Sequence, residues 1–318
     1  MSEEVRVAFV GAGLMAREHA RAFATLPGVV PAGVYSRTRE RAAELAAEFG
    51  MPVVADSIDA LARDSGAQIV VVAVNEPAVP EVCRGVFQHG WQVLLEKPPG
   101  HDPATARSLL TMAEAGKAAV RVALNRRFYE STTVLCSELA QSGGTRFIQV
   151  LDQESPFEAR ACGHGELVLR NWMYANSIHM VDFLPVFGRG EITDVHVASR
   201  WIPDRPCCVV AHVGFSSGDH GSYHGVWEGP GPWAVAVNTV GARYEMRPVE
   251  HLTRQVAGSR RAEPVELPGV EGGLKPGLLA QARAAVSLAR GAETALPTLT
   301  TAIRTMELIE RIYFPDRR

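Results

Sequence analysis

Short apolar runs alternate with longer stretches of helical spacing over the first 124 residues. The apolar runs are VRVAFV, VVPAGVYS, PVVA, AQIVVVAV, WQVLLE and AAVRVAL, and each has the length of a strand. Alanine-rich stretches between them, at residues 15–26, 40–49, 58–64, 79–89 and 103–114, predict helices. This alternation predicts a parallel sheet with crossover helices, in which the valine-rich run at residues 69–74 is buried on both faces.

The pattern changes after residue 124, where strands follow one another with little helix between them. A helix is expected at residues 130–141, a strand at 145–151, an irregular stretch, and a further helix near 175–187. Five strands are then expected at residues 192–201, 207–215, 221–228, 233–240 and 243–249, and helices at 277–290 and 300–312 close the chain. The predicted fold class is α/β, with one domain at residues 1–124 and an α+β domain with a large, mainly antiparallel open sheet at residues 125–318.

Composition narrows the class of protein and its partners. Of 318 residues, 47% are hydrophobic and 21% are charged, and 32 basic against 35 acidic residues give a net charge of -3. This balance is typical of a soluble globular protein and gives no basic signature for nucleic acid. No apolar run approaches the roughly 20 residues of a membrane span. The start MSEEVRVAFV lacks the features of a signal peptide, so a cytoplasmic protein without membrane contact is expected.

The cysteines and histidines predict neither a disulfide framework nor a metal site. The five cysteines are an odd number without CxxC spacing, which predicts reduced thiols at Cys83, Cys136, Cys162, Cys207 and Cys208. Three histidines fall near one hairpin without a carboxylate or cysteine cluster to complete a site, namely His212, His220 and His224. No metal is therefore expected.

The sequence GAGLMA directly follows the first expected strand and opens the first expected helix. Gly11, Gly13 and Ala16 match the order GxGxxA. In this motif the first glycine permits a tight turn, the second lets a pyrophosphate approach the backbone, and the alanine lets helix and strand pack closely. Leu14 and Met15 complete the turn at the positive end of the helix. A Rossmann dinucleotide-binding domain is predicted, and the alternative is a glycine-rich turn without a ligand.

Selectivity between NAD and NADP is set at the end of the second strand. An NAD-specific site usually has Asp or Glu there, but this chain has Ser36 and Arg37, and its first carboxylate is Glu40. Arginine accommodates the additional phosphate of NADP, so NADP is favoured. NAD is the alternative if Arg37 is a solvated residue at a helix start. Asn75 ends the strand IVVVAV, where ligands collect in open parallel sheets, and is expected to touch the cofactor or else to form a turn.

Five segments together resemble the Gfo/Idh/MocA oxidoreductases, the family of glucose-fructose oxidoreductase and inositol dehydrogenase. They are GAGLMA, SRT, LLEKPPG, NRRF and SIHMVDFL, and Glu-Lys-Pro within the third is the most specific. The resemblance implies a Rossmann domain, a second domain whose open sheet makes homodimer or homotetramer contacts, and catalysis in the cleft between them. It also implies that Glu96 and Lys97 lie beside the nicotinamide, where Lys97 would hydrogen-bond the substrate oxygen and relay charge. The alternative for Lys97 is a surface lysine that closes a strand.

A second catalytic element implied by the resemblance is an Asp four residues before a His on a helix, an arrangement that sets both side chains on one face. His179 matches the histidine and is interpreted as a general acid or base, or else as a buried core histidine. Position 175 departs from the family pattern because it is Ala175. Tyr174 and Asn176 flank it, and Tyr174 could supply a hydroxyl if the helix register or the substrate pose differs.

Further candidate substrate contacts are weighed against structural roles. Asp182 would orient the histidine three residues before it or bind a substrate hydroxyl, or else make a structural hydrogen bond. Trp172 would stack on a sugar face or belong to the core. Asn125 and Arg127 in NRRF resemble cleft residues of the family, with an interdomain salt bridge as the alternative for the arginine.

Together these features predict an NAD(P)-dependent oxidoreductase that transfers hydride between nicotinamide and a secondary alcohol or ketone of a sugar, cyclitol or nucleotide-linked sugar. Lys97 would supply charge and His179 the proton. An imine or biliverdin-type reductase on the same fold is an alternative, since the expected aspartate is missing. A non-catalytic dinucleotide-sensing regulator is the alternative outside enzymes, and the presence of both Lys97 and His179 disfavours it.

Overall fold

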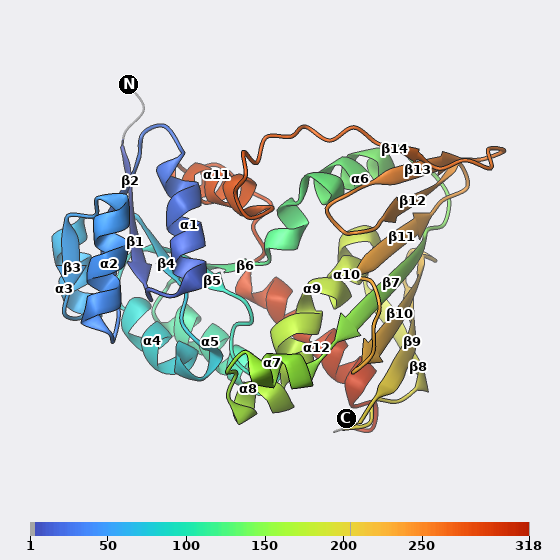
Figure 1. Ribbon diagram of the computed structural model, residues 1–318, viewed down its shortest axis with the longest axis horizontal. Helices are drawn as coiled ribbons and strands as arrows, with labels where there is room; N and C mark the ends of the chain where they lie inside the picture. The colour runs from blue at the N-terminus through green and yellow to red at the C-terminus, as the bar shows by residue number, and fades with distance from the viewer. Residues whose placement is uncertain (1–3, 204, 318) are drawn as a thin grey trace. The chain divides into compact units, whose positions relative to one another are not determined.

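The computed structural model describes residues 4–203 and 205–317, and the chain divides into two compact units (Figure 1). Unit 1 comprises the chain up to Phe128 together with Glu271–Ile303, and unit 2 comprises Tyr129–Val270 together with the chain from Arg304 onward. The predicted division at residue 124 differs from these units in two respects, because unit 1 extends to Phe128 and because the segment at 271–303 returns to it. Among the described residues, no helix combines the length and apolar character of a membrane span.

Unit 1 is built on a six-stranded sheet in the order β3-β2-β1-β4-β5-β6, with every neighbouring pair parallel. Its strands are β1 (Val5–Val10), β2 (Val29–Tyr35), β3 (Val53–Ala55), β4 (Ile69–Val72), β5 (Gln92–Glu96) and β6 (Ala119–Ala123). Its helices are α1 (Leu14–Ala24), α2 (Arg39–Phe49), α3 (Ile58–Ser65), α4 (Val79–Val86), α5 (Pro103–Ala115) and α11 (Leu278–Ala289), with short turns η1 (Glu76–Ala78) and η2 (Asn125–Phe128). This arrangement confirms the predicted Rossmann sheet, and its order reverses between β1 and β4, where ligands bind in open α/β sheets.

Burial explains both the central strands and the return of α11. Val7 and Phe9 of β1 pack on one side of the sheet with apolar residues of α1, α2 and α11, while Ala8 and Val10 on the other side are also buried. A strand covered on both faces needs an unbroken apolar sequence. Leu278, Leu279, Ala282, Ala285 and Val286 form the buried side of α11, which packs beside α1. Covering this apolar stripe brings α11 back to unit 1.

Unit 2 is built on an eight-stranded sheet in the order β14-β13-β12-β11-β7-β10-β9-β8. The strands are β7 (Phe147–Glu154), β8 (Ile192–Ser199), β9 (Cys207–Phe215), β10 (His220–Trp227), β11 (Ala234–Asn238), β12 (Ala242–Met246), β13 (Thr253–Val256) and β14 (Glu263–Pro264). Only the β7–β10 pair is parallel, so the sheet is mainly antiparallel as predicted. The helices are α6 (Glu130–Ala140), α7 (Pro156–Ala161), α8 (Glu166–Arg170), α9 (Ile178–Val181), α10 (Phe183–Phe187) and most of α12 (Leu299–Tyr313).

The segment between β7 and β8 differs most from expectation. The stretch expected to be irregular contains α7 and α8, which are too short for a helical period to show in the sequence. The single helix expected near residues 175–187 is divided into a π-helical turn, Met173–Ser177, followed by α9 and α10. The strands β13 and β14 were also missed, because both are short and largely polar.

The buried carboxylate of Asp219 fastens three segments of unit 2 together. It accepts hydrogen bonds from the backbone N–H of Arg146 (2.8 Å), which precedes β7, and of Arg189 (3.1 Å), which follows α10. The guanidinium of Arg189 adds bonds of 2.9 and 2.6 Å. Burial opposes ionisation of Asp219, but these donors outweigh it and hold its pKa well below the usual range.

We expect Asp219→Asn to lower the free energy of unfolding by about 2–4 kcal/mol at neutral pH, because it leaves the guanidinium of Arg189 without its charged partner. The lowered pKa means that the carboxylate stabilises the fold above about pH 4 and that this contribution is lost as the pH falls further. Denaturant unfolding at several pH values should therefore show the wild-type advantage shrinking in acid.

The matched control is Asp316→Asn, which removes an exposed partner of Arg200 and should cost less than about 1 kcal/mol. Equal stability losses for the two variants would contradict the assigned role of Asp219.

Candidate active site

The turn after β1 has the geometry that the GxGxxA motif requires. Gly11 has a φ of +108°, and a Cβ built there would lie 2.1 Å from the backbone oxygen of Ala73, so only glycine fits. Gly13 caps α1 with a φ of -89°, and a Cβ there would meet no described atom within 4 Å. The backbone at Gly13, where α1 begins, therefore has open space beside it, as the approach of a pyrophosphate requires.

A pocket of about 370 Å³ joins this turn to the ends of β2 and β4. It is lined by residues 10–13, 35–38, 41, 73–75, 78 and 82. The expected cofactor residues Gly11, Gly13, Ser36, Arg37 and Asn75 therefore share one pocket. Leu14, Met15 and Ala16 do not line it. Leu14 is 69% exposed, whereas Ala16 is fully buried against the sheet.

The end of β5 is tied to α1 by a buried ion pair. Nε2 of His19, on the inner face of α1, lies 2.7 Å from Oε1 of Glu96. The other carboxylate oxygen accepts the backbone N–H of Lys97 at 3.1 Å. Burial opposes ionisation of Glu96, but His19 and then Lys97 outweigh it and lower its pKa. The carboxylate thus fixes the backbone where the strand ends and the two prolines follow.

Lys97 is partly buried in unit 1 and lies in an electrostatically mixed environment. Burial lowers the pKa of its ammonium group most strongly. Glu96 and Glu76 act in the opposite direction, while Arg126 and Lys275 add repulsion. The net effect lowers the pKa, which is the change that lets a lysine exchange a proton nearer neutral pH.

The segment that carries His179 in unit 2 has a wider helical turn than expected. Met173–Ser177 is π-helical, with hydrogen bonds over five residues instead of four, and α9 continues from Ile178. Tyr174 lies within this wider turn, and His179 lies in the α-helix that follows it. Both side chains are buried, Tyr174 to 2% and His179 to 8% exposure. The helix register here therefore differs from that of the single regular helix expected near residues 175–187.

A buried carboxylate on β7 holds the start of this segment. Glu154 accepts hydrogen bonds from the indole N–H of Trp172 (2.6 Å), the amide of Asn176 (2.9 Å) and the hydroxyl of Ser177 (3.1 Å). Burial and then the charge of Asp152, two residues earlier on the same face of β7, raise the pKa of Glu154 well above its usual range.

The polar network extends from this carboxylate to α12. Tyr223 of β10 donates to Asp152 (2.7 Å), and its hydroxyl lies 2.6 Å from that of Tyr313. The hydroxyl of Tyr313 lies 3.4 Å from that of Ser177, which returns to Glu154. Burial raises the pKa of both tyrosines, so both stay protonated as donors. A continuous hydrogen-bonded chain therefore runs beneath the π-helical turn.

Asn125 and Asp182 each make a hydrogen bond within their own unit. The Asn125 amide donates to the backbone oxygen of Pro276 at 3.0 Å, so it fastens the segment that leads into α11. Oδ1 of Asp182 accepts from Thr305 of α12 at 2.8 Å. Lys97, Asn125 and Arg127 belong to unit 1, whereas Trp172, His179 and Asp182 belong to unit 2. Among the described residues, no group of three His, Cys, Asp or Glu side chains is placed to hold a metal ion.

Sequence reasoning missed His19 and the carboxylates of β7. His19 falls on the apolar face of α1, between Ala16 and Phe23. Asp152 and Glu154 occupy inward positions of an alternating strand that also buries Ile148 and Val150. A charged or titratable residue on an apolar face is the signal that would have indicated them.

Comparisons with known proteins indicate the class of protein, an oxidoreductase with an NAD-binding domain. Residues 5–124 match a family described as an oxidoreductase family with an NAD-binding Rossmann fold. Inositol 2-dehydrogenase of Streptomyces avermitilis is 32% identical over 145 residues, which cover 45% of this chain and 42% of that protein. UDP-N-acetylglucosamine 3-dehydrogenase of Acidithiobacillus ferrooxidans is 30% identical over 158 residues, covering 49% and 48%. The chain thus spans about half the length of the curated relatives it matches.

A solved structure extends the likeness in fold to the whole chain. The structure of UDP-N-acetylglucosamine 3-dehydrogenase from Acidithiobacillus ferrooxidans superposes with a TM-score of 0.78 at 20% identity, covering 97% of this chain and 96% of that one. Residues 5–124 therefore match the NAD-binding domain of the Gfo/Idh/MocA oxidoreductases, and the whole chain shares the fold of this solved structure.

The two glycines of the turn give a matched pair of variants. Gly11→Ala should destabilise the fold by about 3 kcal/mol or more, because the methyl group meets the backbone of Ala73 in a left-handed conformation. Gly13→Ala should unfold within about 1 kcal/mol of wild type but bind NADPH at least about tenfold more weakly, since its methyl group occupies the approach of the phosphates. Thermal unfolding and fluorescence titration with NADPH measure the two effects, and wild-type NADPH affinity in Gly13→Ala would contradict the assignment.

Proposed function

We propose that this protein is an NAD(P)-dependent oxidoreductase that interconverts a secondary alcohol and a ketone on a sugar, cyclitol or nucleotide-linked sugar. The observation that carries the proposal is Lys97, which has a lowered pKa and stands at the carboxyl end of a Rossmann strand. The match of residues 5–124 to an oxidoreductase family supports the reaction class. The names of the two relatives, a dehydrogenase of inositol and one of a UDP-linked sugar, support the substrate class.

The choice of lysine at position 97 is itself informative. Of the 32 basic residues in this chain, 29 are arginines, and the three lysines are Lys97, Lys117 and Lys275. Arginine stays protonated at all accessible pH values, whereas a buried lysine can release its proton. A chain that uses arginine for nearly all of its positive charge has a lysine at the position proposed to transfer a proton to the substrate oxygen.

Each assigned residue has a defined part in the reaction. When bound, the nicotinamide supplies or accepts the hydride. In the reducing direction, the Lys97 ammonium hydrogen-bonds the ketone oxygen, stabilises the negative charge that develops there, and gives it a proton. In the oxidising direction the neutral amine takes the hydroxyl proton as hydride leaves the carbon. Glu96 and His19 position Lys97 through its backbone.

His179 is assigned as the second proton carrier, with Tyr174 as the group that replaces the acid absent at Ala175. The π-helical turn supports this assignment, because Tyr174, five residues before the histidine, lies within this wider turn. Glu154 fixes the side chains of Trp172 and Asn176, which are proposed to meet the substrate hydroxyls. Asp182, Asn125 and Arg127 remain proposed substrate contacts.

NADP is the proposed cofactor, with NAD as the alternative. The pocket of unit 1 is lined by Ser36 and Arg37, which follow β2, and by Arg41 of α2. The first acidic residue after β2 is Glu40. A cationic lining suits the phosphate on the ribose of NADP.

We also infer a cytoplasmic protein that forms a homodimer or homotetramer through the open sheet of unit 2. The five cysteines all lie within the described residues and form no disulfide, which supports a reducing compartment. Exposed side chains that alternate along β8, together with Phe147 of β7, support a sheet face available to a second copy.

Lys97→Met should cut turnover of the productive substrate by about a hundredfold or more while NADPH affinity stays within a few fold, because the change removes a proton-carrying group but no phosphate contact. The measurement is NADPH oxidation with a panel of ketosugars, ketocyclitols and nucleotide-linked ketosugars. Lys117→Met, at an exposed lysine, is the control. Unchanged turnover in Lys97→Met would contradict the catalytic role. If the wild-type protein binds NADPH but turns over none of the compounds in the panel, the result would favour a dinucleotide sensor.

Arg37→Ala should reduce the preference for NADPH over NADH by about tenfold or more, since a charge-assisted bond to phosphate is lost. Arg39→Ala is the matched control, because the guanidinium of Arg39 pairs with Asp56. Affinities for both dinucleotides in the three proteins measure the effect. A preference that survives in Arg37→Ala would contradict the assignment of the phosphate site.

A further inference from the structure

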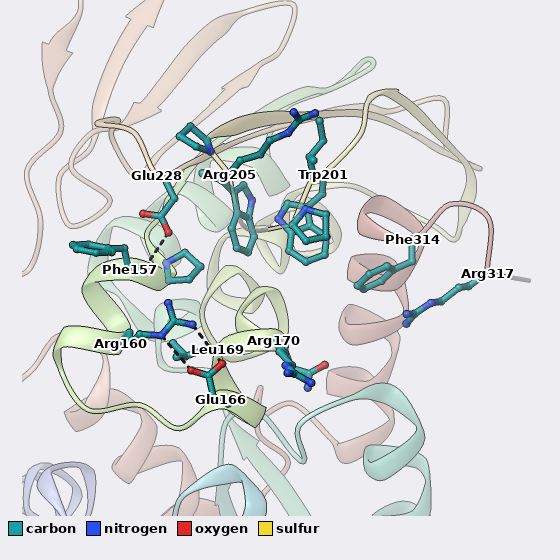
Figure 2. Close-up of a pocket in the computed structure, with 16 residues that line it drawn as sticks. Phe157, Arg160, Glu166, Leu169, Arg170, Trp201, Arg205, Glu228, Phe314 and Arg317 are labelled. Atoms are coloured by element: carbon teal, nitrogen blue, oxygen red, sulfur yellow. Dashed lines mark hydrogen bonds and ion pairs between the residues drawn. The ribbon is translucent and has the colours of Figure 1, made fainter.

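Unit 2 contains a pocket of about 890 Å³ (Figure 2). Its walls come from four parts of the unit: residues in and around α7 and α8, the connection between β8 and β9, the end of β10, and the residues after α12. A volume of this size accommodates a drug-sized organic molecule. The pocket lies wholly within unit 2 and shares no lining residue with the dinucleotide pocket of unit 1.

One wall of the pocket is a rigid aromatic surface. The Trp201 ring lies 5.4 Å from that of Trp227 and 5.7 Å from that of Phe314. Trp227 is held in turn by its indole N–H, which donates to the hydroxyl of Tyr313 at 3.1 Å. Trp201 remains partly exposed, so it presents a supported flat surface on which a ring can stack.

The charges around the pocket favour an anion. Figure 2 shows Arg160, Arg170, Arg205 and Arg317 around it. Arg160 pairs with Glu166 at 3.2 Å, and the guanidinium of Arg317 lies 4.0 Å from the ring centre of Phe314. Within the described ranges, neither Arg170 nor Arg205 has a carboxylate at salt-bridge distance. These two guanidinium groups are therefore available for a ligand.

The other carboxylate of the pocket is already engaged by the protein. Glu228 accepts the hydroxyl of Ser155 at 2.8 Å and the backbone N–H of Phe157 at 2.9 Å. Its backbone has a φ of +55°, which is uncommon for a residue with a side chain. Since Glu228 is held by α7 and Glu166 by Arg160, neither negative charge neutralises Arg170 or Arg205.

We propose that this pocket binds a nucleoside diphosphate, as the carrier group of a nucleotide-linked sugar substrate. The base stacks on Trp201, and the diphosphate is bound by Arg170 and Arg205, whose planar guanidinium groups suit phosphate oxygens. Two arginines on separate segments suit a diphosphate, which carries several charges, better than they suit a ligand with a single carboxylate. The substrate role rests on the proposed oxidoreductase function, whereas binding in the pocket does not.

The chain connects this pocket directly to the proposed catalytic segment. Leu169, Arg170 and Asn171 line the pocket at the end of α8, and Trp172 and the π-helical turn follow at once. A carrier group anchored here supplies binding energy remote from the reacting carbon, which an enzyme uses to orient that carbon.

Calorimetric titration of the full chain with UDP and with dTDP tests the proposal. Saturating NADP is present throughout, so that the diphosphate cannot occupy the turn after β1. We expect saturable binding with a Kd in the range of about 1–100 μM. The double variant Arg170→Ala with Arg205→Ala should bind at least about tenfold more weakly. Arg311→Ala, an exposed arginine of α12 outside the pocket, should bind as wild type.

Absence of saturable binding at millimolar UDP and dTDP would overturn the proposal, as would equal affinity in the double variant. Tighter binding of benzoate or inorganic pyrophosphate than of either nucleotide would assign the pocket to another class of ligand and would equally overturn it. Failure of this binding proposal is distinguishable from failure of the oxidoreductase function. If the pocket binds no nucleotide, turnover of free sugars that depends on Lys97 would still be observed.

Discussion

The carboxylate of Glu96 is the contact on which the candidate chemistry of unit 1 depends. One oxygen binds His19 of α1 at 2.7 Å, and the other accepts the backbone N–H of Lys97 at 3.1 Å. The helix whose N-terminus faces the dinucleotide pocket is thereby tied to the strand end that carries the lysine. The buried carboxylate of Glu96 thus links the helix that follows the glycine-rich turn to the strand end that carries Lys97.

Burial acts on the two neighbours with different results. It opposes the charge of both Glu96 and Lys97, but Glu96 has a hydrogen-bonding partner that overcomes it and keeps the carboxylate ionised. For Lys97 burial prevails, and its pKa is lowered. The two adjacent residues therefore differ in role, since Glu96 anchors the backbone and Lys97 is the proposed proton carrier. On β7 of unit 2, burial and then the charge of Asp152 raise the pKa of Glu154, which holds the start of the segment of His179.

The features that the sequence predicted well are those specified by neighbouring residues. The six parallel strands and the GAGLMA turn follow from local apolar runs and from a φ that only glycine adopts at position 11. The helices α7 and α8 escaped prediction because five or six residues do not establish a helical period. The return of α11 to unit 1 depends on which apolar surface it covers, a choice between distant parts of the chain.

The candidate site divides in the same way. Gly11, Gly13, Ser36, Arg37 and Asn75 follow strand ends, so topology alone brings them to one pocket. The contact of His19 with Glu96, beside Lys97, spans 77 residues, and the contact of Trp172 with Glu154 spans 18, so no local pattern specifies them. The π-helical turn is likewise a tertiary outcome, since nothing in MYANS distinguishes it from an α-helix.

The pKa of the Lys97 side chain, measured by NMR, tests the central claim most directly. With three lysines in the chain, labelled side-chain amines give three signals, and the one that disappears in Lys97→Met belongs to Lys97. The account predicts that this amine titrates clearly below the value of about 10.4 for a free lysine. A Lys97 signal that titrates at or above that value would contradict its role as the proton carrier.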